Sequence, residues 1–340
     1  MSVSSSLSRP EKPSLSVILP TIDGLWRIDR TITHLEAQTA RSELEVLVVA
    51  PSVELLGLDR DLSEAFFDFR ILDVGEIQSL SEVKAVAVAD ARSDLVVFAE
   101  DHSWPDPDWA AAIIEAHASG YAAVGPKVRN ANPGSILSWA NYLACFGRWS
   151  DKSQAGEVLQ TPWHNSSYRR KDLVACGSDL PRLLAVEGVL QDKLRERGHR
   201  LFLLPEVTTD HVNISRFGSW LRQSFWGGKL YGGARSVGES WGALRRIIYI
   251  AGSPLIPLLR FKRMLPELRR FQEQTHLLPR VIPALALSFA IHAIGEASGY
   301  AFGIGSAGDR YIEFEARRFE AISHQDLVDL GLEQVVEDNV

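Results

Sequence analysis

Cysteine is scarce in this chain of 340 residues, which contains only Cys145 and Cys176. Two cysteines cannot form the disulfide framework of a small secreted domain, so both are expected to be reduced thiols in a cytoplasmic compartment. The polar start MSVSSSLSRPEKP has no signal-peptide pattern. Very long apolar runs are also missing. The apolar stretch Val281 to Gly295 is 15 residues long, whereas a spanning helix needs about 20.

Glycine-rich phosphate loops are missing too. The chain has no GxGxxG and no Walker loop, which argues against a dinucleotide dehydrogenase and against a P-loop NTPase. The first apolar strand likewise lacks a glycine-rich loop after it, so a nucleotidyltransferase on a similar sheet is the weaker alternative.

Short β-rich apolar runs alternate with helical segments in the first half of the chain. This alternation predicts an α/β fold with a mostly parallel, doubly wound sheet flanked by helices. A composition of 46% hydrophobic residues allows a substantial core. The predicted strands are Leu15–Pro20, Leu44–Ala50, Phe69–Val74, Leu95–Ala99, Tyr121–Val128 and His199–Glu206, and the predicted helices are Ile28–Gln38, Ser81–Ala91, Trp109–Ala118 and Leu183–Gly198.

The strand at Leu95 ends abruptly in Glu100, Asp101 and His102. Ligands of open α/β sheets bind beyond the carboxyl ends of the strands, so these three side chains form a candidate site for a metal or a phosphate. Pro105 and Pro107 restrict the backbone of the segment that follows. The alternative is an ordinary solvated turn.

Two later segments carry further polar candidates. Glu187 lies next to the apolar stripe of the predicted helix 183–198, so its carboxylate is either paired structurally or has a raised pKa that suits proton abstraction. Arg169, Arg170 and Lys171 are consecutive. They cannot all lie on one helix face, so at least one is expected to point into a nearby cleft; the alternative is a solvated helix start.

Positive charge is concentrated in residues 213–280, which hold 12 of the 36 Lys and Arg residues and only three acids. This segment has a charge of +9, and the remainder is therefore −16 because the whole chain is −7. Basic and aromatic residues interleave here, which favours a helical region lying in the interface of an anionic membrane. Packing as core or as a dimer surface is the alternative. No nucleic-acid module is recognisable.

The order of several motifs resembles the family 2 glycosyltransferases of GT-A fold, and in particular a bacterial subgroup whose metal motif is Glu-Asp-His. The resemblance covers roughly the whole chain. Its motifs are LSVILPT, SEVKAVAVADARSDLVVFAEDHSWPDPDW, HNSSYRRKDL, the Glu187 helix ending in RGHRL, and LPEVTTDHVN. It implies a disordered lead at 1–13, a catalytic domain at 14–213, a basic amphipathic region at 214–322 and an acidic tail at 323–340.

The resemblance also implies roles for individual residues. Glu100, His102 and His211 would hold a divalent metal, Mn²⁺ or Mg²⁺, and Glu187 would be the catalytic base. Family members often carry an acidic pair after the second strand for base recognition, whereas this chain has Ala50-Pro51-Ser52 there, so the donor base stays open. The residues implied to bind the donor are Thr21, Lys84, Glu100, Asp101, Asn165, Arg169 and Arg170.

The activity implied is inverting transfer of a sugar from a nucleoside-diphosphate sugar to a hydroxyl of a glycan or a lipid-linked acceptor. The enzyme would lie on the cytoplasmic face of the membrane as a peripheral protein and could form a homo-oligomer. An alternative of another class is a catalytically degenerate GT-A domain that binds a sugar nucleotide or serves assembly. The unusual metal triplet and the glutamate at position 187, where the family normally has aspartate, lend it weight.

Overall fold

The computed structural model describes residues 11–58, 60–271 and 277–337. Most of the predicted lead 1–13 lies outside these residues. The described chain forms two compact units. The first consists of Met1–Val128 and Gln154–Asp210, and the second of Arg129–Ser153 and His211–Val340. Compared with the predicted domain 14–213, residues 129–153 group instead with the C-terminal part of the chain.

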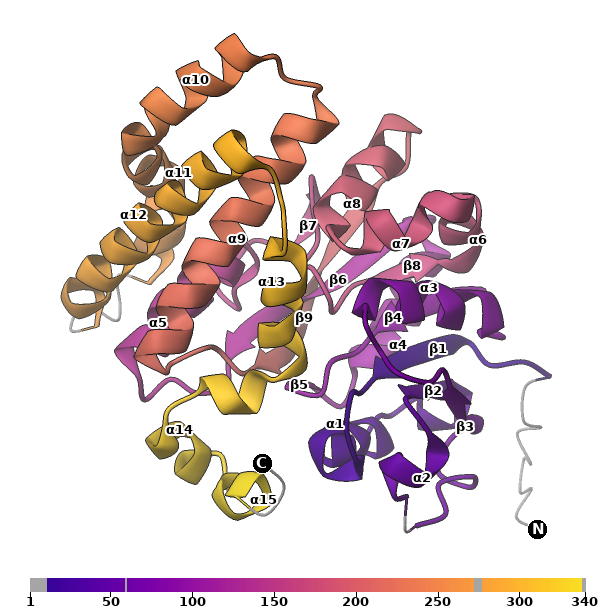
Figure 1. The fold of residues 1–340 in the computed structure, drawn as a ribbon. Helices are drawn as coiled ribbons and strands as arrows, with labels where there is room; N and C mark the ends of the chain where they lie inside the picture. Colours follow the sequence, from indigo (N-terminus) through magenta and orange to yellow (C-terminus); the bar gives the residue numbers. More distant parts are fainter. Residues whose placement is uncertain (1–10, 59, 272–276, 338–340) are drawn as a thin grey trace, which may run out of the picture. The chain divides into compact units, whose positions relative to one another are not determined.

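A twisted sheet organises the first unit (Figure 1). Four neighbouring strands are parallel, in the order β3, β2, β1, β4, and β8 then pairs antiparallel with β4. The α/β fold with a mostly parallel sheet flanked by helices is therefore confirmed. The strands are β1 (Leu15–Pro20), β2 (Leu44–Ala50), β3 (Asp68–Asp73), β4 (Leu95–Phe98), β5 (Ser103–Pro105), β6 (Ala123–Asn130), β7 (Gly156–Val158), β8 (Ser167–Arg169) and β9 (Leu201–His211).

The central strands are buried on both faces, which explains their continuous apolar sequences. Val17 and Leu19 of β1 face one core cluster and Ile18 faces the other, as a period of two requires. Helices α1 (Leu25–Glu36) and α4 (Trp109–Ala118) cover the first face. Helices α3 (Leu80–Asp90), α7 (Leu180–Leu184) and α8 (Glu187–Glu196) cover the second.

The single helix predicted at 183–198 is wrong. The structure has α7 and α8, separated by Val186 with φ −139° and ψ 80°. The apolar residues keep a helical spacing across the break, so the sequence pattern does not reveal it. As a consequence Glu187 is the first residue of α8, where the helix dipole favours a negative charge.

The second unit is helical, so the predicted C-terminal helical region is confirmed. It also contains a helix within residues 129–153, which precede the C-terminal part of the chain. Its longer helices are α5 (Ile136–Phe146), α9 (Phe217–Gly238), α10 (Ala243–Gly252), α11 (Ile256–Arg270), α12 (Leu278–Phe302) and α13 (Ala307–Ala316), followed by the short helices α14 (His324–Asp329) and α15 (Glu333–Glu337).

Helices α9 and α12 approach each other closely through glycines. A Cβ on Gly228 would lie 2.1 Å from the His292 carbonyl oxygen, and one on Gly295 would lie 2.2 Å from that of Phe225. Gly295 ends the apolar stretch 281–295 of the sequence, but in the structure it is a contact point with α9. The helix continues beyond it. The helix runs 25 residues. Among the described residues it is the one helix that is long and apolar enough to cross a membrane, by length and composition only.

The predicted acidic tail 323–340 is partly a structural element. Asp326 is 2% exposed, and its carboxylate accepts hydrogen bonds from Ser215, Ser323 and Asn132. Because a buried carboxylate needs such donors, Asp326 anchors α14 within the second unit.

His117, at the end of α4, is 7% exposed. Its Nδ1 lies 3.0 Å from the Tyr121 carbonyl oxygen and its Nε2 2.9 Å from Ser167 Oγ. Burial lowers the pKa of His117 to about 4.

This pKa predicts an acid-dependent loss of stability. Between pH 6.5 and 4 the unfolded chain binds a proton at this position and the folded chain does not, so stability falls as the pH falls. From pH 7.5 to 4.5, His117 should account for a loss of about 2 to 3 kcal/mol. Urea unfolding of the wild type and of His117→Asn at both values measures it. An equal loss in both proteins would contradict the assignment.

Candidate functional site

The turn Glu100–His102 follows β4 and is held in place by α1. The Thr31 hydroxyl donates to the carbonyl oxygens of Glu100 and Asp101, at 2.9 and 3.1 Å. All three side chains of the turn are buried, with exposures of 7, 6 and 1% for Glu100, Asp101 and His102. The turn is therefore not an ordinary solvated strand end. Thr31 contributes to the site, although no sequence motif marks it.

Asp101 orients the imidazole of His102. Asp101 Oδ1 lies 2.5 Å from His102 Nδ1, and His102 Nε2 lies 3.8 Å from Glu100 Oε2. With the Nδ1 proton shared with Asp101, the lone pair of Nε2 is available on the side of Glu100. Metal–ligand bonds are about 2.1 Å long, so two donors up to about 4.2 Å apart can bind one ion. Glu100 and His102 fit a divalent cation, and Asp101 acts through His102.

Two further polar residues support this turn. Asn165 Nδ2 donates to Glu100 Oε2 at 2.9 Å, so the structure brings the predicted residue Asn165 to the predicted ligand Glu100. Arg27 is 1% exposed, and its Nη1 lies 3.9 Å from Asp101 Oδ2. The charge of Asp101 is therefore partly compensated, which allows it to be buried.

Glu187 is fully engaged within the first unit. Its Oε1 accepts from the His164 backbone N–H at 3.1 Å, and its Oε2 accepts from the Tyr168 hydroxyl at 3.0 Å. Gln191 in turn donates to that hydroxyl at 2.8 Å. Burial, followed by the charge of Glu187, raises the pKa of Tyr168 well above its ordinary value, so Tyr168 remains a donor.

The sequence predicted Glu187 beside the apolar stripe of a helix, and its side chain has no exposed surface. Of the two expected possibilities, structural pairing is what the structure shows. Lys84 Nζ lies 4.0 Å from Glu187 Oε1, and the Lys84 side chain is 6% exposed. The predicted basic residue Lys84 and the predicted base Glu187 therefore belong to one buried cluster.

His164 connects the two parts of the site. Its Nδ1 lies 3.5 Å from Glu187 Oε1 and 4.0 Å from Glu100 Oε1, and 3.5 Å from Lys84 Nζ. Its backbone has φ +74°, in the left-handed region that residues other than glycine rarely adopt. The sequence motif contains this histidine, but nothing in it indicated the strained backbone.

Trp163 packs over the first turn of α8. A Cβ on Gly188 would lie 2.7 Å from Cζ2 of the Trp163 ring. The absence of a side chain at 188 thus lets the indole lie directly beside Glu187. The same segment, residues 162–165, reaches the carboxylate through the backbone N–H of His164.

The charges of the cluster suit a cation. Glu100, Asp101 and Glu187 are three buried carboxylates, with Arg27 beside the second and Lys84 beside the third. Carboxylates buried close together repel one another, so a divalent cation beside Glu100 would stabilise this arrangement.

Thr21, predicted to cradle the donor base, follows β1 at the carboxyl edge of the parallel strands. It is 2% exposed, and its Oγ1 hydrogen-bonds the backbone of Asp23, donating to the carbonyl oxygen at 3.1 Å and accepting from the N–H at 3.2 Å. These bonds shape the turn that leads into α1.

Arg169 and Arg170 lie at the amino end of β4, at the opposite end of that strand from Glu100. Because β8 is antiparallel to β4, Arg169 pairs with Leu95 at the start of β4, about 16 Å along the strand from Glu100. Arg169 bonds Asp172 at 2.7 Å, and Arg170 donates to two carbonyl oxygens at the end of α3. Their contact with the donor stays a prediction.

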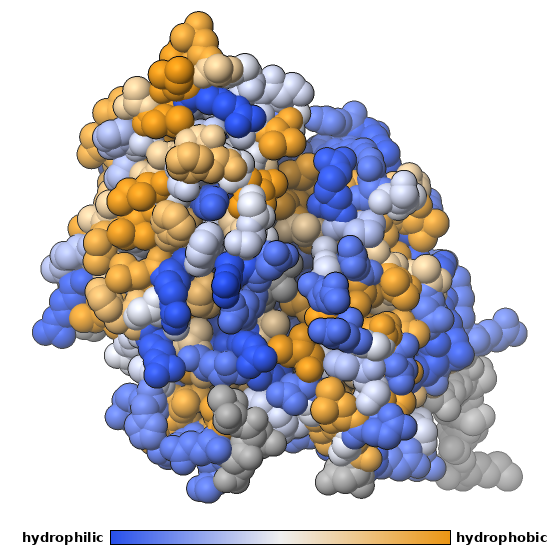
Figure 2. All heavy atoms as spheres, viewed as in Figure 1, coloured by the Kyte–Doolittle hydropathy of each residue, from blue (hydrophilic) through white to orange (hydrophobic). Residues whose placement is uncertain are grey.

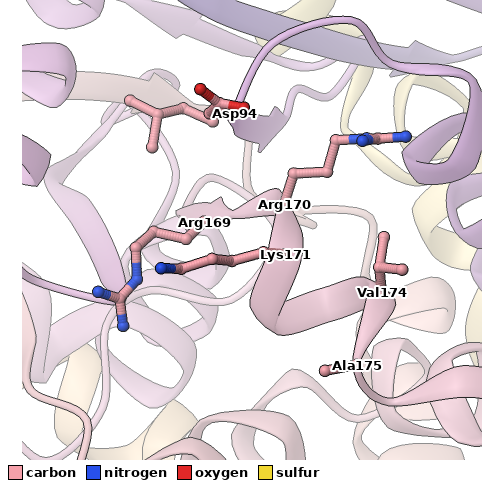
Figure 3. A pocket seen from close by; sticks show the side chains of 7 residues that line it. Asp94, Arg169, Arg170, Lys171, Val174 and Ala175 are labelled. Carbon is pink, nitrogen blue, oxygen red and sulfur yellow. The ribbon is translucent and has the colours of Figure 1, made fainter.

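The basic triplet instead lines a separate pocket of about 710 Å³ at the amino end of β4. Figure 3 shows Arg169 and Lys171 extending to one side of the junction between β8 and α6 (Arg170–Val174) and Arg170 to the other. The three side chains thus diverge, as consecutive residues must. The lining of this pocket does not include Glu100.

His211 is the last residue of β9 and is 1% exposed. By its contacts it belongs to the second unit, whereas Glu100 and His102 belong to the first. Its role as a metal ligand stays a prediction.

Comparisons with known proteins give structural likenesses only. No protein-family model matches the chain, and no curated protein matches it. A mannosyltransferase from Pyrobaculum calidifontis, solved with GDP-Man and Mn2+, is 15% identical, with 95% of this chain and 84% of that chain covered and a TM-score of 0.48. S. aureus TarS 1-349 with UDP is 16% identical, with coverages of 84% and 91% and a TM-score of 0.46.

GalNAc-T7 with UDP, GalNAc and Mn2+ is 13% identical, with 58% of this chain covered and a TM-score of 0.46. The chain spans 43% of the length of that protein.

The backbone strain at His164 predicts an unusual order of stabilities. His164→Gly and His164→Ala both remove the ring, but glycine adopts φ +74° without cost. The glycine variant should therefore be the more stable by about 1 kcal/mol. Urea unfolding measures the difference. The matched variants His34→Gly and His34→Ala, inside α1, should show the opposite order, with the alanine variant the more stable. The same order at both positions would contradict a strained residue 164.

Proposed function

We propose that this protein is a metal-dependent glycosyltransferase of GT-A fold, related to family 2, that moves a sugar from a nucleoside-diphosphate sugar to a hydroxyl of a glycan or lipid-linked acceptor. One observation carries the proposal. The pair Glu100–His102, oriented by Asp101, is joined through His164 to Glu187 in a single buried cluster at the carboxyl edge of the sheet. The motif order in the sequence supports the same assignment.

Glu100 and His102 would hold Mn²⁺ or Mg²⁺, with His211 as a further predicted ligand. Such an ion neutralises the charge that develops on the β-phosphate as the sugar leaves. Asn165 keeps the Glu100 carboxylate in place, and Lys84 supplies a second, fixed positive charge next to the site. Thr21 shapes the turn beside which the nucleotide base would lie.

Glu187 would accept the proton of the acceptor hydroxyl, in one displacement with inversion at the anomeric carbon. Since both of its oxygens are engaged, this role requires segment 162–165 to move when substrates enter. The strained His164 supports such a movement, because unfavourable backbone conformations cluster at functional sites. His164 would withdraw its N–H from Glu187 and leave the carboxylate open to the acceptor.

The second candidate is a catalytically degenerate GT-A domain that binds a sugar nucleotide and serves assembly. The complete burial of Glu187 and its two hydrogen bonds favour this alternative, because a carboxylate paired in this way has a structural role without any catalysis.

Replacing Glu187 by Gln separates the two functions. Purified protein is incubated with Mn²⁺ and a panel of uridine, guanosine and thymidine diphosphate sugars, with candidate acceptors. Loss of the general base should lower release of nucleoside diphosphate by about 10² to 10⁴, while the donor Kd changes little. Glu82→Gln, an exposed change on α3, is the matched control and should leave both unchanged.

Equal turnover of the wild type and Glu187→Gln would refute the role of Glu187 as base. Donor binding by the wild type without any turnover would favour the degenerate domain. A wild-type protein that binds no sugar nucleotide would overturn the proposed function as a whole.

A further inference from the structure

The second unit carries an exposed apolar ridge along α10, the turn Ser253–Leu255 and α11. Helix α10 has no buried residue, and its apolar positions 244, 247, 248 and 251 follow the spacing of a single helix face. Figure 2 shows hydrophobic atoms gathered over these helices. The ridge consists of Leu244, Ile247, Ile248, Leu255, Leu258 and Leu259, each 50 to 73% exposed.

The ridge is not an unfilled side of the core, because the same helices contact α12 through other residues. Tyr249 of α10 packs against Tyr300 of α12, with ring centroids 5.7 Å apart. Phe261 of α11 packs against Phe289 of α12 at 5.0 Å. The apolar ridge is a second, outward face. Isolated exposed leucines are ordinary, whereas a continuous row of them indicates a surface that contacts a membrane or another protein.

Basic residues border the ridge. Residues 243–270 contain seven Lys or Arg and one acid, Glu267. Lys262 lies one helical turn beyond Leu258 on α11, and Arg263 and Arg269 follow. Within the part of the chain that the structure describes, no acidic side chain pairs with Lys262, Arg263 or Arg269. Unpaired cations next to an apolar face match a layer of anionic headgroups above acyl chains.

We propose that α10 and α11 dock this unit onto an anionic lipid surface, with the ridge at the acyl boundary and the bordering cations at the phosphates. A second copy of the chain fits less well, because two such faces would bring together net charges of the same sign. A nucleic acid fits less well because the outward row is aliphatic and offers few rings for base stacking.

The docking is peripheral even though α12 is long enough to span. Glu296 of α12 is 4% exposed and lies within a polar network, with Arg260 at 3.5 Å, His292 at 3.3 Å and the Tyr300 hydroxyl at 2.8 Å. Together with the glycine contacts to α9, this network ties α12 to its protein neighbours. Moving α12 alone into a bilayer would break these contacts and place the charges in hydrocarbon.

Vesicle flotation of the full chain tests the proposal. Vesicles of phosphatidylcholine with about one third phosphatidylglycerol should float the protein. Pure phosphatidylcholine vesicles should do so at least about tenfold less, because each headgroup-facing cation is worth about fivefold in partitioning and several border the ridge. Ile247→Gln/Ile248→Gln should weaken binding by about tenfold or more, since two exposed isoleucines lose their burial. Lys262→Gln/Arg263→Gln should remove most of the preference for anionic vesicles.

Val53→Gln/Leu55→Gln is the matched control, because these side chains on α2 (Val53–Leu56) are 47 and 49% exposed in the first unit. It should bind as the wild type does. Equal unfolding midpoints show that all variants fold. The readout is binding and not transfer, so the result is independent of the proposed function.

Three results would overturn the proposal. The first is the absence of wild-type flotation with anionic vesicles. The second is a wild-type protein that does not bind vesicles but forms a dimer, which the ridge variants dissociate. The ridge would then bind a second copy of the chain. The third is resistance of the membrane-bound protein to extraction by alkaline carbonate, because α12 would then span the bilayer.

Discussion

The hydrogen bond between Asp101 and His102 is the interaction on which the candidate site depends. It fixes which imidazole nitrogen faces Glu100, and it can do so only because Thr31 holds the carbonyl groups of the same turn. This turn directly follows β4. Because β4 is buried on both faces, it lies in the centre of the sheet. A short polar run after an apolar strand thus becomes a rigid set of donors, and rigidity is what a cation site requires of its ligands.

Around this turn the first unit concentrates charge and strain in one place. Three carboxylates are buried near each other, and the chain crosses between them at His164 with a backbone that residues other than glycine avoid. Both features cost stability, and nothing in the packing of the sheet demands them. Their coincidence at the carboxyl edge of parallel strands, where open α/β sheets bind ligands, is the physical argument for function.

Local patterns in the sequence predicted much of this. Strands β1 and β2 and helix α4 have the predicted bounds, because runs of buried aliphatic residues and a proline corner leave few alternatives. The turn 100–102 could also be found, since polar residues after a buried strand are conspicuous.

The features that the sequence did not predict depend on distant partners. The antiparallel direction of β8 places Arg169 at the far end of β4 from Glu100, and the helix predicted at 183–198 breaks before Glu187. The glycines of α12 pack against α9 and so do not end the helix. Neither pairing direction nor helix contact can be read from one segment alone.

The central claim is that His102, oriented by Asp101, binds the cation together with Glu100. Pulsed electron paramagnetic resonance of Mn²⁺ bound to the full chain with a nucleoside diphosphate tests it most directly. The account predicts a coupling from a directly bound imidazole nitrogen that is lost or clearly reduced in His102→Gln and unchanged in His34→Gln. A spectrum without nitrogen coupling, or one that His102→Gln leaves unchanged, would contradict it.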